Sequence, residues 1–232
     1  MKKPKMITVL IFLIAVPLTL LLGSRLPGRW YYLTGTLMIA ELLIPFFLAF
    51  EGRKPQAREL VLMAVMCALA VAARVAIPIP NFKAIYGVIM IAGIAFGPES
   101  GFLVGAISAL SSNFFLSQGP YTPWQMMAYG AGGMLAGFLF RKGGRKPLHM
   151  GIAGFLIVLL LIGPILDTCT VFTAPITRNL KSILAIYLSG FAVNISQGIS
   201  TFAVLFLLGN PMLEKIKRIQ IKYGMIEEKT ED

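Results

Sequence analysis

Long apolar runs, separated by short polar or basic segments, fill almost all of this 232-residue chain. Hydrophobic residues make up 57% of the sequence and charged residues only 13%, a balance far from that of soluble domains. Helices cross a bilayer in about 17–25 apolar residues, because a helix satisfies its own backbone hydrogen bonds. The pattern therefore predicts an all-α polytopic membrane protein.

The apolar runs divide the chain into three expected units. An N-terminal two-helix membrane hairpin occupies 1–56, a six-helix core occupies 57–209, and a cytoplasmic amphipathic tail occupies 210–232. The tail carries apolar residues at helical spacing with lysines between them, which is typical of a helix on a membrane surface. The eight expected spans are 7–23, 30–50, 59–77, 84–96, 101–116, 124–140, 151–166 and 182–208.

The distribution of basic residues predicts the orientation of these spans. Fifteen of the 21 Lys and Arg residues fall on the side of the N-terminus and six on the other side. Cytoplasmic loops of membrane proteins collect Lys and Arg, so both termini are expected in the cytoplasm. The same rule accounts for the net charge of +11 without a nucleic-acid partner. It also puts the loops 78–83, 117–124 and 167–181 outside together, which predicts an outward-facing pocket.

The stretch 102–140 has the clearest local design. Two apolar segments flank the polar bend 117–124, and small residues recur in both segments. Small residues allow membrane helices to approach closely, and the bend between them is a candidate mouth for a ligand. Gly130, Gly132 and Gly133 suit either a wide mouth or tight helix packing.

No catalytic or metal-binding pattern is visible in the sequence. It contains no GxxxxGK[ST] phosphate loop, no HExxH and no GxSxG, so it lacks the standard means of hydrolysing ATP. The single histidine, His149, lies in a basic loop, and Cys67 and Cys169 have no metal-ligand spacing. We expect no catalytic residues, no metal and no cofactor. A chain with an outward pocket and no ATP-hydrolysing motif either works with a partner that hydrolyses ATP or does not transport.

Four segments resemble the substrate-binding S components of energy-coupling factor (ECF) transporters. They are ARELVLMAVMCALAVAAR (57–74), GIAFGPESGFLVGAISALSSNFF (93–115), QGPYTPWQM (118–126) and GMLAGFLF (133–140). The resemblance implies a six-helix S-component core in the bacterial plasma membrane that binds a vitamin or related micronutrient from outside. It also implies partners: a transmembrane coupling subunit and two cytoplasmic ATPases, which would carry out ATP hydrolysis.

The resemblance bears on three further features. S components contact the coupling subunit through an alanine-xxx-alanine motif, which Ala64, Ala68 and Ala72 match; packing within this chain is the alternative. The hairpin 1–56 departs from the usual six spans, and we expect it to pack beside the core with Glu41 facing the core. The QGP-x-TPWQM segment is similar to S components for cobalamin. Another vitamin, a queuosine precursor, or a stand-alone membrane protein that senses a small molecule remains open.

Candidate ligand-binding residues lie at the expected outer ends of the spans and, for Asn194 and Gln197, along the eighth span. Aromatic side chains there could stack on a ligand ring or belong to the interfacial belt. Amides could bind a ligand, cap a helix or pair with another helix, and lysine could meet an anionic group or extend toward the interface. Arg74 is expected to extend in that way, and Asp167 to cap a helix. The candidates are Asn81, Lys83, Tyr86, Asn113, Gln118, Tyr121, Trp124, Asn194 and Gln197.

Overall fold

The computed structural model describes residues 11–15, 18–19, 30–52, 56–76, 79, 81–174 and 179–225. This part of the chain is built of helices and contains no strand. A short π-helix, η1 (Ile11–Ala15), precedes the main helices. These are α3 (Trp30–Gly52), α4 (Ala57–Val75), α5 (Ala84–Phe96), α6 (Pro98–Leu116), α7 (Thr122–Leu139), α8 (Pro147–Ile157), η2 (Val158–Ile162), α9 (Gly163–Thr173) and α10 (Leu180–Lys222).

The prediction of an all-α polytopic membrane protein is confirmed. Within the described ranges, three stretches are long and apolar enough to cross a membrane: Leu33–Gly52, Pro147–Thr173 and Leu180–Lys222. α5 is a shorter apolar helix that matches the expected span 84–96. The expected span 7–23 lies largely outside the described residues.

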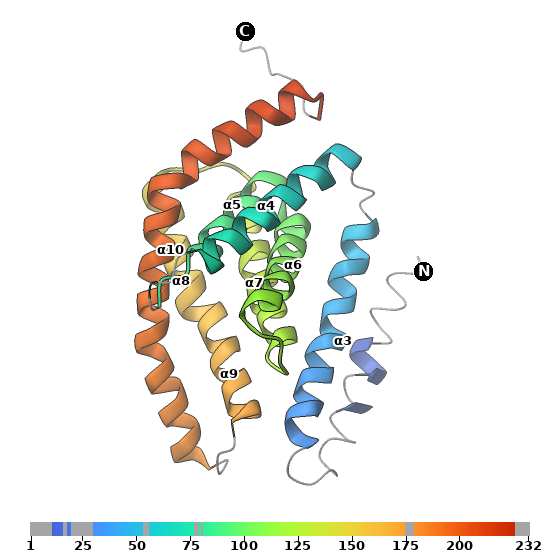
Figure 1. Ribbon diagram of the computed structural model, residues 1–232, viewed down its shortest axis with the longest axis vertical. Helices are drawn as coiled ribbons and strands as arrows, with labels where there is room; N and C mark the ends of the chain where they lie inside the picture. Colours follow the sequence, from blue (N-terminus) through green and yellow to red (C-terminus); the bar gives the residue numbers. More distant parts are fainter. Residues whose placement is uncertain are drawn as a thin grey trace.

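The helix α5 forms the centre of the fold. Twelve of its 13 residues are buried, and it packs against α4, α6, α7 and α10. A helix that is apolar all round is stable only when other elements surround it. In Figure 1, α4 crosses the bundle obliquely, at a steep angle to α3 and α10.

The helices α6 and α7 have the most extensive contact in the described structure. A Cβ added at Gly105 would meet the Tyr129 carbonyl group, and one added at Gly133 would meet the Gly101 oxygen. Gly130 packs on Phe102 in the same way. The small residues of 102–140 therefore serve close packing rather than a wide mouth.

The chain from α8 to α9 is one helical stretch, not a span followed by a loop. The loop expected from residue 167 is wrong, because α9 continues to Thr173 and includes Asp167 and Cys169. The π-turn η2 precedes Pro164, which has no N–H to donate to the preceding turn. A π-turn accommodates such a missing bond without ending the helix.

The last span and the tail form a single helix of 43 residues, α10, with Pro211 inside it. Figure 1 shows that its final part turns away from its long straight part. Proline causes such kinks in helices. In the turned part, Leu213 and Ile216 belong to the same core cluster as Met63 and Met66. The apolar face of the tail thus packs on protein, whereas we expected it to lie on the membrane surface.

The helix α3, the larger described part of the expected N-terminal hairpin, lies beside the core. α3 contacts α6, α7 and α9, and its Thr36 hydroxyl donates to the Pro120 carbonyl at 2.9 Å. Glu41 does not meet the expectation that it faces the core. Its Oε1 accepts a 2.6 Å hydrogen bond from Thr19 in the N-terminal segment.

Candidate functional site

A cluster of polar side chains lies where α4, α5, α6, α7 and α10 converge. Arg74, in the last turn of α4, donates from Nη1 to Ser112 Oγ at 2.5 Å and to Asn113 Oδ1 at 3.0 Å. Its Nη2 donates to Gln125 Oε1 at 3.5 Å. The guanidinium carbon lies 5.6 Å from the centre of the Tyr129 ring, within the range of cation–π attraction. We call this group the polar cluster: Arg74, Lys83, Tyr86, Ser112, Asn113, Thr122, Gln125, Tyr129, Gln197 and Ser200.

Asn113 connects the two helices on either side of the polar bend. It is only 1% exposed, and its Nδ2 donates to Thr122 Oγ1 at 3.0 Å and to Gln125 Oε1 at 2.9 Å. The Thr122 hydroxyl donates to Gln118 Oε1 at 2.9 Å, and Gln118 Nε2 donates to the Leu110 carbonyl at 3.1 Å. Buried amides need such partners. The bend is therefore fixed to the ends of both helices.

Two tyrosines form the inner side of the polar cluster. The rings of Tyr86 and Tyr129 meet edge to face, with centroids 5.0 Å apart. The Tyr86 hydroxyl donates to Gln197 Oε1 on α10 at 3.1 Å. Aromatic pairs in this geometry stabilise their position beyond the effect of burial alone. These contacts hold α5, α7 and α10 together at one point.

Lys83 lies deep along α10. Its backbone N–H donates to Ser200 Oγ at 3.0 Å, and Ser200 follows the first residue of α10, Leu180, by 20 residues, roughly 30 Å along the axis. Lys83, the residue before α5, thus lies beside the middle of α10. The Lys83 side chain is half-buried, and the Arg74 guanidinium is its nearby charged neighbour.

The remaining predicted site residues lie outside the polar cluster. Trp124 is 3% exposed and packs with Ile39 and Cys169, and its ring centroid is 5.4 Å from that of Phe172. It faces α3 and α9 rather than the arginine. Tyr121, which packs against the same residues, donates to the Ser117 carbonyl at 3.0 Å.

The two predicted asparagines on other elements also lie apart. Asn194 donates from Nδ2 to Asp167 Oδ2 at 2.8 Å, joining α10 to α9. This is a helix-to-helix pair of the kind that buried amides form. Asn81 is exposed in the turn before α5 and has φ of 59°, a left-handed conformation that asparagine tolerates better than most residues.

Sequence reasoning missed six of the ten residues of the polar cluster. Arg74 was assigned to the interface, whereas it points to three neutral acceptors in the bundle. Gln125 and Tyr129 carry a usable signal, because residues four apart share one face of a helix. Ser112 and Ser200 carry no signal, since isolated serines are common in packed membrane helices.

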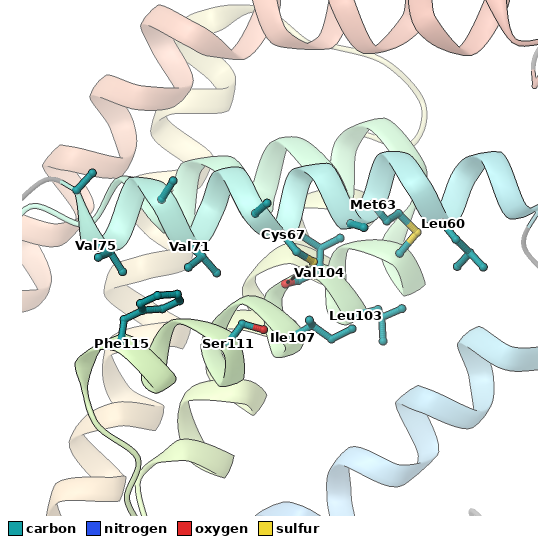
Figure 2. Close-up of a pocket in the computed structure, with 14 residues that line it drawn as sticks. Leu60, Met63, Cys67, Val71, Val75, Leu103, Val104, Ile107, Ser111 and Phe115 are labelled. Atoms are coloured by element: carbon teal, nitrogen blue, oxygen red, sulfur yellow. Dashed lines mark hydrogen bonds between the residues drawn. The ribbon is translucent and has the colours of Figure 1, made fainter.

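The outer face of α4 forms a second feature, an apolar groove shared with α6. Ala64, Ala68 and Ala72 are exposed rather than packed within the described chain. They line a groove of about 720 Å³. Figure 2 shows Leu103, Ile107, Ser111 and Phe115 of α6 along its other wall. An exposed apolar strip of small residues is typical of a helix-packing surface in lipid.

Comparison with known proteins assigns the chain to a family. The model of the ECF-type riboflavin transporter S component matches residues 54–215, more than two thirds of the chain. The chain belongs to the S-component family of ECF-type transporters. The matched range of this S component includes α4 to α9 and most of α10, and hence the whole polar cluster and the groove. No curated protein and no solved structure matches.

The family result confirms the resemblance at the level of the S component. This S component is a substrate-binding subunit of a membrane transporter and not an enzyme. The closer similarity to cobalamin-type S components is not supported, because the matching family is described by riboflavin transport.

Proposed function

We propose that this S component captures a micronutrient from outside the cell at the polar cluster. It delivers the micronutrient inward together with a transmembrane coupling subunit and two cytoplasmic ATPases. The observation that carries the proposal concerns α4. This one helix lines the exposed apolar groove with its alanines and supplies Arg74 to the polar cluster.

The polar cluster has the chemistry of a ligand site. It combines an aromatic pair with amide, hydroxyl and cationic groups from five helices. Small-molecule sites typically have apolar and aromatic walls with a few convergent polar groups. Binding there would engage helices that are distant in sequence, so the ligand could stabilise one arrangement of the bundle.

The groove fits a helix of the coupling subunit. Its lining is almost wholly apolar, and alanines allow another helix backbone to approach closely. In lipid, van der Waals packing at small residues is what draws two helices together. This supports the motif role of Ala64, Ala68 and Ala72.

A flavin is the first ligand to test, because the matching family is described by riboflavin transport. The fold gives less support to cobalamin as the ligand than the sequence did. The wide mouth that a corrinoid needs rested on Gly130, Gly132 and Gly133, and all three glycines are in close helix contact. The absorption spectrum of the purified protein separates a bound flavin from a bound corrinoid.

Isolation of the tagged protein from its native membrane tests the proposal. We expect mass spectrometry to identify a coupling subunit, two ATPases and a retained micronutrient. Recovery of a ligand without any ATPase in repeated preparations would instead support a stand-alone sensing protein. Recovery of neither would contradict both functions.

Substitution of Asn113 tests the position of the ligand site. We expect Asn113→Ala to weaken ligand binding about tenfold, because it removes a fixed amide that orients Arg74 and Gln125. Trp124→Phe is the matched control in the same bend, and it should change affinity less than about twofold. Titration of the purified protein measures both. A larger effect at Trp124 than at Asn113 would move the site toward α3 and α9.

Cysteine labelling tests the orientation. Ser117 and Lys142 are exposed in loops at opposite ends of α7. In a background without Cys67 and Cys169, a membrane-impermeant maleimide applied to intact cells should label Ser117→Cys and spare Lys142→Cys. Labelling should reach both after the membrane is opened. The reverse pattern in intact cells would invert the proposed topology.

A further inference from the structure

Two cationic side chains in the polar cluster have no acidic partner in the described part of the chain. The guanidinium of Arg74 donates only to neutral oxygens, those of Ser112, Asn113 and Gln125. Its Nε is buried without an acceptor among the described residues. Lys83 is half-buried and close enough to Arg74 for the two positive charges to repel each other.

Three carboxylates among the described residues already have hydrogen-bond partners. Asp167 accepts from Asn194, Glu59 from Ser100, and Glu41 from Thr19. Glu51 lies at the end of α3, Glu99 at the start of α6, and Glu214 in the turned part of α10, whereas Arg74 bonds to residues near the end of α6. Among the residues that the structure describes, no carboxylate is therefore positioned to neutralise the pair.

An uncompensated pair of cations is expensive in a bundle. Removing a charge from water costs free energy unless an opposite charge or several hydrogen bonds replace the water, and two like charges repel each other. The N-terminus of α5, where Lys83 is the cap residue, adds the positive end of a helix dipole. The site as built has a positive potential that an anion would relieve.

We infer that the solute captured by this S component carries an anionic group, a carboxylate or a phosphate, and that Arg74 and Lys83 bind it. The inference rests on the proposed function, because it specifies the charge of the captured solute. Guanidinium presents parallel donors that match both anions, and ammonium acts as a point charge. The buried Tyr86–Tyr129 pair lies beside Arg74, and the Tyr129 ring holds the guanidinium in place by cation–π attraction.

Riboflavin and riboflavin 5′-phosphate form a suitable pair of probes, since they share one ring system and differ in one phosphate group. Flavin fluorescence reports binding to the purified subunit alone, so the result is independent of coupling to partners. We expect the phosphate ester to bind at least about tenfold more tightly than riboflavin. Equal affinities, or tighter binding of riboflavin, would overturn the inference while leaving the proposed function intact.

Substitution of Lys83 identifies the residue that senses the charge. Lys83→Gln should weaken binding of the phosphate ester at least about tenfold more than it weakens binding of riboflavin. Lys181→Gln, which removes an exposed lysine at the start of α10, is the matched control and should affect neither probe. Equal losses for both probes in Lys83→Gln would indicate a structural role and contradict the inference.

Retained compounds extend the test beyond flavins. Mass spectrometry of the purified wild-type protein should recover a water-soluble carboxylate or phosphate compound, which Lys83→Gln loses. A neutral retained compound would overturn the inference. So would a phospholipid that is lost in Lys83→Gln, because it would assign the cations to a lipid headgroup. If nothing is retained and neither the phosphate ester nor millimolar inorganic phosphate raises the melting temperature, the anion site is excluded.

Discussion

Uptake falls at least about a hundredfold in the Ala68→Trp variant, the change expected from a loss of about 3 kcal/mol in association free energy. Ala68 is exposed near the middle of the groove between α4 and α6. An indole there fills the space that a helix of the coupling subunit would occupy. The polar cluster lies at the end of α4 and is not touched, so ligand binding to the purified subunit should stay within about twofold of the wild type.

The matched control for this prediction is Val65→Trp. Val65 is also an exposed residue of α4, but it does not line the groove. Radiolabelled ligand uptake and recovery of the coupling subunit by affinity purification measure both variants. Normal uptake by Ala68→Trp would exclude the groove as the docking surface. Equal loss in both variants would show that the whole outer face of α4 is sensitive.

The Gly105→Ala variant loses about 1–3 kcal/mol of folding free energy through one added methyl group. The added carbon meets the backbone of Tyr129 and Gly130 on α7, and backbone cannot move aside as a flexible side chain does. Alanine is the better helix former by about 1 kcal/mol, so the close contact must outweigh this gain. Because Tyr129 belongs to the polar cluster, ligand affinity should fall together with stability.

Thermal unfolding in detergent, with and without ligand, measures the effect of Gly105→Ala. A decrease of about 5 °C or more is expected. Gly52→Ala at the end of α3 is the control, since a Cβ there meets nothing within 4 Å. If the two variants have equal melting temperatures, then α6 and α7 accommodate the added methyl group without loss of folding free energy. Close packing at Gly105 would then not stabilise the pair.

Apolar run length predicted the helices well where polar residues end them. The span 84–96 is bounded by Lys83 and Gly97, and α5 has these limits. The predictions failed where a polar residue or proline lies inside a helix. Asp167 in α9 pairs with Asn194, and Pro211 in α10 is followed by residues of the core cluster. These tertiary contacts compensate for local signals that would otherwise end a helix.

The polar cluster, our proposed ligand site, was predicted only in part, because a polar residue near a helix end can face either the bundle or its surroundings. Sequence gives the height of Lys83, Asn113 and Trp124 along their helices, but not the face on which each lies. Asn113 faces Arg74, whereas Trp124 faces Ile39 of the N-terminal hairpin. Arg74 was missed because an arginine near the end of a span is ordinarily placed in the headgroup region.

The continuity of α4 links the two surfaces of the protein mechanically. This helix has 19 residues with no proline or glycine to bend it, so a tilt imposed at the alanines also moves Arg74. If the polar cluster binds the ligand and the groove binds the coupling subunit, as we propose, both affinities depend on the orientation of α4, and each binding event changes the affinity for the other partner by the same factor. A subunit that docks by tilting α4 would withdraw the arginine from Ser112 and Asn113. The tilt of α4 that accompanies docking would thereby also lower the affinity of the subunit for its ligand.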